Sequence, residues 1–371
     1  MSDTQIKVAG LVDDLNASII NRNEEVKAAV ACLLSKNSMF LLGVPGVAKS
    51  LLVQNILQGI TDARGFIWLL SQTTDIQEVV GNVSLKALRE EDKFKYNVEG
   101  KLPTADIAFL DEIFKANSGL LNALLTLLNE RAFDNADERI EVPLVSCFAA
   151  SNELPQDDSL KALYDRFLVR RHVTAINQDD DFKQLLSFNP PPIQAKLTMA
   201  DIKTAQQEAK AMKIDDAFYN SMVELWKYIS VRSPQLQMSD RRWRQSINYI
   251  QARAYIANMS CVSSDCIVFL KDVMWSDPKD IAEVSSVISA NTSPVVAQAQ
   301  AFYNEAVALL DASMTNSSMA NLADIANKVE ELSKKLNILI DADPDKTEFC
   351  LEAKSYLKKA TANLTRRIRG K

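Results

Sequence analysis

Short apolar runs alternate with amphipathic stretches through the first half of the chain. The runs are SMFLLG (38–43), GFIWLL (65–70), DIAFLDE (106–112) and VSCFAASNE (145–153), each bounded by polar or turn-forming residues. The stretches between them carry apolar residues at helical spacing. Strands of this kind, alternating with helices, are typical of a buried parallel sheet. The pattern therefore predicts an α/β domain.

The pattern changes at several points along the chain. Two polar, turn-rich stretches, 83–105 and 134–143, interrupt the sheet region, and we expect each to form a hairpin insertion. After the proline-rich segment 189–194, apolar positions follow helical spacing almost everywhere. Three further helices are expected over 291–371. The predicted domains are an α/β core (1–190), an all-helical domain (191–288) and a C-terminal helical bundle or arm (289–371).

Length, charge and cysteines limit the class of protein. The 371 residues exceed the ~250–300 at which a single core stops growing, so several domains are expected. Forty-two Lys and Arg against 48 Asp and Glu leave a net charge of −6, which offers no overall attraction to nucleic acid. Five scattered cysteines read as core thiols in a reducing compartment. With neither a secretory signal nor an apolar run of ~18 residues, we expect a cytoplasmic protein without a membrane span.

Residues 43–50, GVPGVAKS, lie between an apolar run and a helical stretch. In a phosphate-binding loop, backbone N–H groups and a helix N-terminus face the phosphates, a lysine contacts the outer phosphates and a hydroxyl holds Mg²⁺. Gly43, Gly46, Lys49 and Ser50 fit these roles, although Ala48 stands where the usual pattern has its second glycine. The alternative is a strand-to-helix turn with a surface lysine.

Polar residues close two of the later apolar runs. Asp111 and Glu112 end the third run, where open α/β sheets bind their ligands. Asp111 is expected to hold Mg²⁺ through water, and Glu112 to orient and deprotonate an attacking water. Asn152 ends the fourth run and could position that water or touch the γ-phosphate. The alternatives are a solvated acidic strand end for the acids and an Asx turn for Asn152.

Two arginine-containing motifs follow, ALYDRFLVRRHV with Arg166 and MSDRRWRQS with Arg241 and Arg242. Isolated arginines are usually surface residues. Taken in order, however, the five elements resemble the AAA+ ATPases, and specifically the MoxR family near its regulatory-ATPase-variant-A branch. GVPGVAKS is similar to that family's Walker A, which itself carries Ala before Lys. FLDEIFKANSGLLNALLTLLNERAF resembles its Walker B region, ASNELP its sensor 1, LYDRFLVRR its arginine-finger segment and SDRRWRQS its sensor 2.

The resemblance covers roughly residues 8–285 and implies an AAA+ parallel-sheet P-loop NTPase core, an all-α lid and a C-terminal helical arm. It implies Arg166 acting on a neighbour's γ-phosphate, Arg241 as the sensor in its own chain with Arg242 as rival, and Arg131 facing the adjacent subunit. Glu112 and Asn152 complete the catalytic set, and Ser50 and Asp111 hold Mg²⁺. The residues expected to bind ATP or ADP are Gly43, Pro45, Gly46, Val47, Ala48, Lys49, Ser50, Leu51 and Arg241.

The function implied is ATP hydrolysis by a ring, expected to be a hexamer, that remodels or activates a protein partner in a chaperone-like way. Many members of the family work with a von Willebrand factor A-domain protein. A nucleotide-gated scaffold with weak turnover and a nucleic-acid-directed motor are the alternatives, and the acidic charge argues against the second. The basic C-terminal stretch suits either the negative end of its helix or an acidic partner or membrane surface.

Overall fold

The structure is a computed structural model that describes residues 1–315, 319–343 and 347–369. Their contacts group them into two compact units. Unit 1 comprises Met1–Ala175, Pro190–Met212 and Met238–Met259, and unit 2 comprises Ile176–Asn189, Lys213–Gln237 and Ser260–Lys371. Each compact unit thus contains segments that are far apart in the sequence. The division at residues 190 and 288 stays a prediction.

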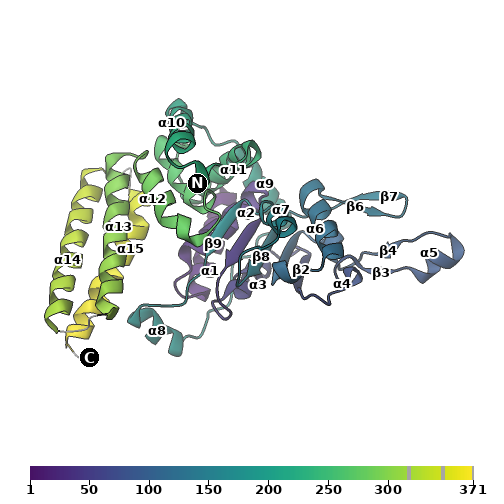
Figure 1. The fold of residues 1–371 in the computed structure, drawn as a ribbon, viewed down its shortest axis with the longest axis horizontal. Coiled ribbons are helices and arrows are strands. Elements are labelled where there is room, and N and C mark those ends of the chain that lie inside the picture. Colours follow the sequence, from purple (N-terminus) through teal and green to yellow (C-terminus); the bar gives the residue numbers. More distant parts are fainter. Residues whose placement is uncertain (316–318, 344–346, 370–371) are drawn as a thin grey trace. The chain divides into compact units, whose positions relative to one another are not determined.

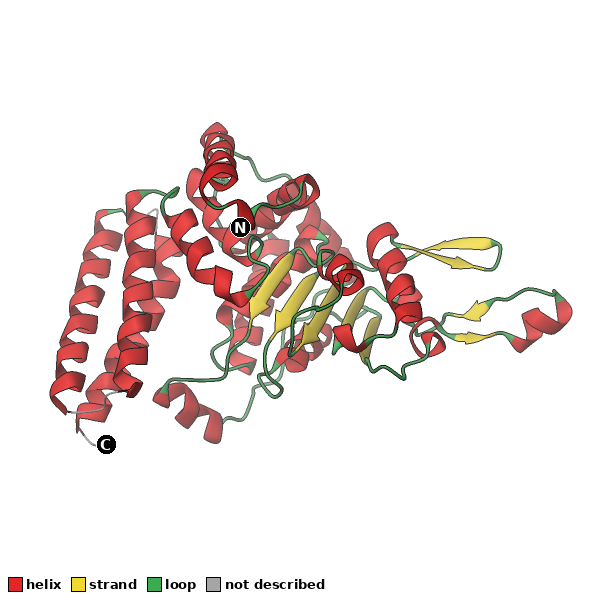
Figure 2. Ribbon diagram, viewed as in Figure 1, coloured by secondary structure: helices red, strands yellow, loops and turns green. Residues whose placement is uncertain are grey.

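Unit 1 is built on a parallel sheet with the strand order β2-β5-β8-β1-β9. Figure 2 shows these strands in yellow with helices packed around them. The strands are β1 (Met39–Leu42), β2 (Gly65–Leu69), β5 (Ile107–Asp111), β8 (Ser146–Ser151) and β9 (Val169–His172). The first four confirm the predicted strands. The edge strand β9 was not predicted, because Arg170, Arg171 and His172 interrupt its apolar pattern.

The helices of unit 1 bury their apolar positions against this sheet and against one another. In the first helix, Val8, Leu11, Val12 and Leu15 recur every three or four residues and are buried, as one face of an amphipathic helix requires. The helices in this unit include α1 (Asp3–Ser18), α2 (Asn23–Ser35), α3 (Lys49–Gly59), α4 (Ile76–Val80), α6 (Ser118–Glu130), α7 (Asp158–Tyr164), α9 (Met199–Lys210) and α11 (Asp240–Ile256), with the short 3₁₀ turns η1 (Leu102–Thr104) and η2 (Ile113–Lys115).

Both predicted insertions are hairpins (Figure 1). The first pairs β3 (Asn82–Val83) with β4 (Tyr96–Asn97) and carries the helix α5 (Leu85–Glu90) at its tip, which was not predicted. The second pairs β6 (Ala132–Asn135) with β7 (Glu138–Glu141). The side chain of Asn135 bonds the Tyr96 backbone twice, at 2.6 and 3.1 Å, and Lys95 lies 3.1 Å from Glu138. The two insertions therefore support each other.

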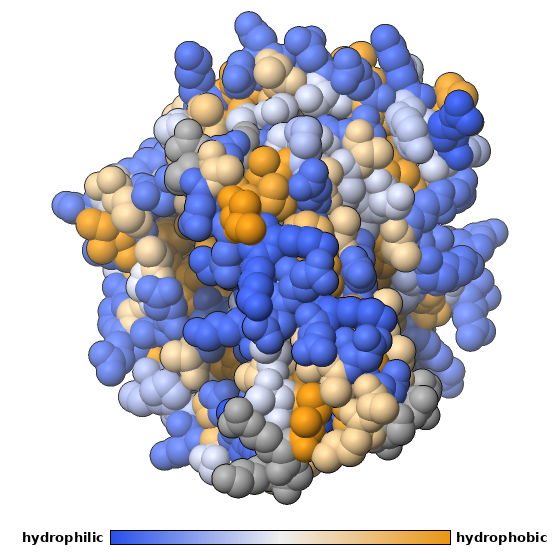
Figure 3. Space-filling model, turned by 90° about the vertical axis from the view of Figure 1, so that its left-hand side faces the viewer, coloured by the Kyte–Doolittle hydropathy of each residue, from blue (hydrophilic) through white to orange (hydrophobic). Residues whose placement is uncertain are grey.

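Unit 2 is helical in all its described elements. They are α8 (Asp179–Leu186), α10 (Asp216–Arg232), η3 (Pro234–Leu236), η4 (Ser264–Asp272), η5 (Pro278–Asp280), α12 (Ile281–Ser289), α13 (Pro294–Thr315), α14 (Met319–Ala342) and α15 (Thr347–Arg369). The last three confirm the predicted bundle. Its core contains Leu322, Ile325, Val329, Leu332, Leu336 and Ile340 from α14, packed against buried residues of α13 and α15. Hydrophilic side chains cover most of the middle of the face in Figure 3.

The basic C-terminal stretch finds partners within its own unit. Lys359 lies 3.0 Å from the buried Asp181 of α8, and Arg366 pairs with Asp180. Arg367 donates to the Ser313 hydroxyl over 2.8 Å. Neither the helix dipole nor an external partner is needed to explain these three cations. None of the described helices is long and apolar enough to cross a membrane.

Candidate active site

The loop between β1 and α3, residues 43–50, is called the phosphate loop below. Gly46 and Ala48 both adopt left-handed backbone conformations, with φ of 83° and 68°. Glycine takes this conformation freely, whereas alanine does so at a cost of roughly 1–2 kcal/mol. A Cβ at Gly43 would overlap the carbonyl oxygen of Val173. Ala48 thus occupies a glycine-like conformation, and α3 begins at Lys49 directly after it.

The buried Arg22 side chain holds the backbone of the phosphate loop by hydrogen bonds. It is 9% exposed, and it donates from Nε to the Val47 carbonyl over 3.3 Å and from Nη2 to the Thr174 carbonyl over 2.7 Å. These bonds join the loop to the segment that follows β9. Sequence reasoning missed Arg22, since no local motif marks an arginine in the turn before α2.

Lys49 lies among the groups that would handle a triphosphate. Its ammonium donates to the carbonyl oxygens of Gly43 and of Val44, the latter over 3.0 Å. Partial burial lowers the pKa of Lys49, whereas the charges of Asp111 and Glu112 oppose that shift. Lys49 and the two predicted acids are therefore close enough to interact electrostatically.

The predicted polar residues meet at the carboxyl edge of the sheet, where the parallel strands end. Strands β5, β8 and β1 are neighbours, with Leu110 opposite Ala149 and Leu42 opposite Ser151. Asp111 thus ends the strand next to the one that Asn152 follows, and the Gly43 N–H donates to the Ser151 carbonyl over 3.1 Å. The structure brings the phosphate loop, the two acids and Asn152 together.

Glu112 has the features of a residue held for function. It adopts a left-handed conformation with φ of 54°, which is strained for a residue with a side chain. Its Oε2 atom is buried, accepts no hydrogen bond from a described residue and pairs with the Lys115 ammonium at 3.4 Å. The neighbouring Asp111 accepts a bond from the Glu112 N–H over 3.0 Å. The backbone thereby orients the Asp111 carboxylate, while Oε2 of Glu112 can still accept a hydrogen bond.

The donor atoms at this edge suit Mg²⁺. The Ser50 hydroxyl stands in the first turn of α3, and the half-buried Asp111 carboxylate ends β5. Mg²⁺ prefers oxygen ligands, keeps several waters and takes only one or two protein groups when phosphates supply the rest. The described residues hold no group of three or more His, Cys, Asp or Glu, which a dedicated protein metal cage would need. Ser50 and Asp111 therefore fit a magnesium–nucleotide complex.

The predicted arginines lie at the opposite, amino edge of the sheet. Arg166 stands between α7 and β9, hence before β9, whereas the phosphate loop comes after β1. The two strands are parallel, with Met39 opposite Val169. Arg166 and the phosphate loop are therefore at opposite ends of the strands, and Arg166 is not placed to reach a nucleotide bound by its own chain.

Arg241 joins Arg166 at the amino edge. Its Nη2 donates to the Asp165 carboxylate over 3.0 Å and to the Asp165 carbonyl over 3.1 Å. Helix α11, which carries Arg241, is tied to α2 by the buried Arg253–Glu24 ion pair of 2.8 Å. The prediction that Arg241 senses the nucleotide of its own chain does not fit this placement, because α11 begins at the edge away from the phosphate loop.

Arg241 and Arg242 differ in burial, and which of them senses the nucleotide stays a prediction. Arg242 is 4% exposed, lies 3.5 Å from the Asp165 carboxylate and donates to the Leu168 carbonyl over 3.3 Å. Burial lowers the pKa of Arg242 to about 9. Arg242 holds the segment before β9, whereas the Arg241 side chain is 39% exposed and bonds Asp165.

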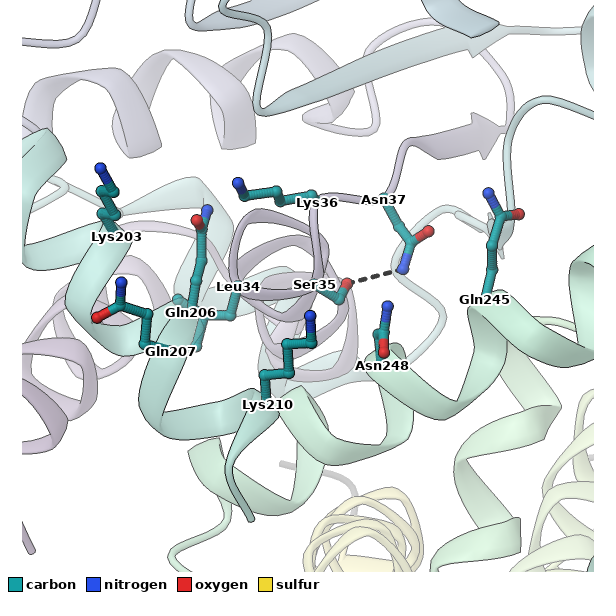
Figure 4. Close-up of a pocket in the computed structure, with 10 residues that line it drawn as sticks. All are labelled: Leu34, Ser35, Lys36, Asn37, Lys203, Gln206, Gln207, Lys210, Gln245 and Asn248. Atoms are coloured by element: carbon teal, nitrogen blue, oxygen red, sulfur yellow. Dashed lines mark hydrogen bonds between the residues drawn. The ribbon is translucent and has the colours of Figure 1, made fainter. Parts of the chain in front are cut away.

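Two cavities open at the amino edge of unit 1. The smaller, about 60 Å³, is called the arginine hollow and is lined by Lys36, Asn37, Ser38, Leu128, Asn129, Arg131, Arg166, Arg241 and Gln245. The larger, about 410 Å³, shares Lys36, Asn37 and Gln245 and adds residues of α9 and α11 (Figure 4). Two lysines of the larger cavity, Lys36 and Lys210, stand at the ends of α2 and α9, where cations suit the helix dipoles.

A parallel sheet with a phosphate loop after β1, an asparagine after the adjacent strand β8 and two acids at the end of the next strand, β5, defines a P-loop nucleoside triphosphatase. Comparison with known proteins narrows the class. Residues 6–211 match the family described as the MoxR domain in MoxR-vWA-beta-propeller ternary systems, and residues 217–288 match an AAA lid domain. The chain belongs to the MoxR family of AAA+ ATPases.

Individual relatives agree with this assignment. A protein of Methanocaldococcus jannaschii without a described function is 36% identical over 289 residues, covering 78% of this chain and 75% of its own. The chaperone MoxR1 of Mycobacterium tuberculosis is 24% identical over 275 residues, covering 72% and 70%. A crystal structure from Cytophaga hutchinsonii, assigned to the ATPases, has a TM-score of 0.60 with 15% identity over 78% of this chain and 94% of that one, and it supports the fold.

Proposed function

We propose that this chain is an Mg²⁺-dependent ATPase that acts as a ring, expected to be a hexamer, and remodels a protein partner. The observation that carries the proposal is the set of groups at the carboxyl edge. There the phosphate loop, Lys49, the Asp111–Glu112 pair and Asn152 end neighbouring strands. Such a set provides phosphate binding and a base for water within one site.

Each residue has a distinct role in the proposed reaction. The N–H groups of the phosphate loop and the Lys49 ammonium bind the β- and γ-phosphates of ATP. Mg²⁺, held by Ser50 and through water by Asp111, would neutralise charge on those phosphates. The Glu112 carboxylate accepts a proton from the attacking water, and Asn152 holds that water in line with the γ-phosphate.

The ring is proposed because each chain carries its arginines away from its own phosphate loop. Arg166 and Arg241 stand at the amino edge, so they are available to the γ-phosphate of an adjacent copy. An arginine supplied by a neighbour stabilises charge that develops during phosphoryl transfer. We therefore assign both arginines a role in trans, and this replaces the role of Arg241 within its own chain.

The partner proposal rests on the relatives. The matched family is named for systems that contain a von Willebrand A-domain protein, and one relative is a chaperone. We propose a protein partner of the A-domain type and a chaperone-like use of ATP. The cytoplasmic location and the regulatory-ATPase-variant-A branch stay predictions of the sequence. The described elements after Pro294 are helical, so the small β-rich module of that branch has no counterpart among them.

The test measures ATP hydrolysis by the purified full chain with and without Mg²⁺. Wild type should hydrolyse ATP only with Mg²⁺. Glu112→Gln should bind ATP normally but turn over ~10²–10⁴-fold more slowly, because the water loses its base. Mass photometry of Glu112→Gln with ATP should show a ring. Glu224→Gln, an exposed acid on α10, is the control. Normal turnover in Glu112→Gln would contradict the assignment, and a ring with negligible wild-type turnover would favour the nucleotide-gated scaffold.

A further inference from the structure

The larger cavity of unit 1, called the lysine cavity below, has a basic lining. Its volume of about 410 Å³ is within the ~300–1,000 Å³ that is typical of ligand pockets. Figure 4 shows side chains around it from three parts of the chain, the end of α2, α9 and α11. Lys36, Lys203 and Lys210 contribute to the lining, and none of the described residues that line it is acidic. The cavity is therefore positively charged in a chain whose net charge is −6.

The acids of α9 do not compensate the lysines of this helix. Asp201 pairs with Lys7 at 2.7 Å. Glu208 accepts hydrogen bonds from the Ser2 and Tyr255 hydroxyls, each over 2.6 Å. Both acids are thus bound to residues outside the lysine cavity, and its three lysines make no ion pair with a described residue.

Helix dipoles explain only part of the positive charge. Lys36 caps the carboxyl end of α2 and Lys210 is the last residue of α9, and each of these helix ends carries roughly half a negative elementary charge. Lys203 lies in the amino-terminal half of α9, where the dipole offers a cation no stabilisation. The two helix ends therefore offset about one of the three positive charges, and about two remain.

The lysine cavity also contains hydrogen-bond acceptors. Five side-chain amides line it, those of Asn37, Gln206, Gln207, Gln245 and Asn248. Asn37 and Gln206 are largely buried, and they donate to the Ser35 hydroxyl over 3.0 Å and to the Leu33 carbonyl over 2.8 Å. The amide oxygens of Asn37 and Gln206 accept no hydrogen bond from a described residue. Because an amide both donates and accepts, a ligand with anionic groups and N–H donors matches this lining.

Hydrogen bonds between the three helices hold the walls of the cavity in place. The Gln206 amide joins α9 to α2, and the Gln251 amide of α11 donates to the Lys210 carbonyl over 3.0 Å. The buried Arg253 of α11 pairs with Glu24 of α2 at 2.8 Å. The cavity is thus preformed, which lowers the entropic cost of binding a ligand.

We infer that the lysine cavity binds a short acidic segment of a protein partner. Glutamate or aspartate side chains pair with the ammonium groups, and the peptide backbone supplies N–H donors and carbonyl acceptors for the amides. An oligophosphate supplies anions but no N–H donor, so the amide oxygens favour a peptide. The arginines of the arginine hollow do not line the lysine cavity. Peptide binding is independent of ATP hydrolysis, and only the identity of the segment as part of the remodelled partner rests on the proposed function.

The first test uses a blocked peptide in which glycine and glutamate alternate, labelled with a neutral dye. Fluorescence anisotropy measures its binding to the full chain without nucleotide, at low ionic strength, where exposed ion pairs are least screened. The affinity should fall about tenfold in Lys203→Gln/Lys210→Gln, because two ion pairs are lost. Lys203→Arg/Lys210→Arg should keep most of the affinity. The charge-matched control, Lys213→Gln/Lys227→Gln, removes two exposed lysines outside the cavity and should bind the peptide like wild type.

Asn248→Ala tests whether the peptide lies across the cavity or along α9 alone. Asn248 is on α11, and loss of its amide should lower the peptide affinity about threefold. Thermal unfolding checks that each variant is folded. Equal affinity of wild type and Lys203→Gln/Lys210→Gln would overturn the proposal. Equally tight binding of a peptide with glutamine in place of glutamate would overturn it as well.

The second test separates the peptide from a phosphate compound and from the proposed ATPase. In full-length Lys49→Ala, unlabelled peptide should displace the labelled peptide at a lower concentration than inorganic tripolyphosphate does. The reverse order would identify a phosphate site and overturn the peptide. Arg166→Ala should bind the peptide like wild type, whereas loss of binding would place the peptide in the arginine hollow and contradict the proposal. Normal turnover of Glu112→Gln would remove the proposed ATPase mechanism and leave peptide binding unaffected.

Discussion

The two edges of the central sheet carry opposite chemistry. At the carboxyl edge, one lysine stands with the two acids Asp111 and Glu112, an arrangement for holding phosphates and activating water. At the amino edge, Arg131, Arg166, Arg241 and Lys36 surround a small hollow without a lining acid. Strand β1 of four residues separates the edges by roughly 13 Å of strand rise.

This difference indicates how the ATPase is completed. Hydrolysis of a nucleoside triphosphate benefits from both a base near the water and cations at the γ-phosphate. A single chain holds the two halves at opposite ends of its strands and cannot join them on one nucleotide. In the proposed ring, a head-to-tail contact between copies would join the two halves without any change within the chain.

The strongest way to break the carboxyl edge is Lys49→Ala. The Lys49 ammonium bonds the loop carbonyls of Gly43 and Val44 and interacts electrostatically with Asp111 and Glu112. Its loss should reduce ATP affinity by on the order of 10²-fold or more. Calorimetry measures the affinity, with Lys86→Ala on the β3–β4 insertion as control. If Lys49→Ala bound ATP with wild-type affinity, residues 43–50 would not be the phosphate-binding loop.

The amino edge is tested by Arg166→Ala. We expect ATP affinity close to wild type, because Arg166 is far from the chain's own phosphate loop, and turnover lower by on the order of 10³–10⁵-fold. Arg244→Ala, on the same helix as Arg241 and exposed, is the matched control. A steady-state ATPase assay distinguishes the outcomes. If Arg166→Ala hydrolysed ATP at the wild-type rate, Arg166 would be a structural residue.

A smaller effect is expected from Arg22→Ala, which tests the link between the phosphate loop and the segment that follows β9. Arg22 holds Val47 and Thr174 by charged hydrogen bonds. Without them the loop is less ordered, and ATP affinity should fall about tenfold, equivalent to ~1.4 kcal/mol. Arg22→Lys should retain part of this affinity. Equal ATP affinity of Arg22→Ala and wild type, measured on folded protein, would show that the loop orders itself.

The carboxyl edge could be predicted from sequence because each of its parts is local. The phosphate loop adjoins its strand and helix, and Asp111, Glu112 and Asn152 directly follow apolar runs. The amino edge could not be assembled in this way. Arg131, Arg166 and Arg241 come from three separated segments, and the packing of α11 on α2 through Arg253 and Glu24 decides that they meet.

Two other features escaped prediction because tertiary partners compensate the cost of burying an arginine. Strand β9 contains Arg170, whose guanidinium stacks 3.9 Å over the Tyr164 ring, so a buried strand position is occupied by a charged residue. Arg22 is likewise buried, and its role depends on carbonyl groups contributed by distant segments. Periodicity reports which face of an element is apolar, and it does not report such tertiary partners.

Subunit mixing tests the central claim that the two edges form one site between copies. Arg166→Ala and Lys49→Ala are each expected to be nearly inactive, the first for want of the arginine and the second for want of bound nucleotide. When the two are mixed and allowed to exchange, an Arg166→Ala chain with ATP can receive the intact arginine of a Lys49→Ala neighbour. Hydrolysis that rises with the proportion of Lys49→Ala supports the account. Inactivity at every ratio, with subunit exchange demonstrated, would contradict it.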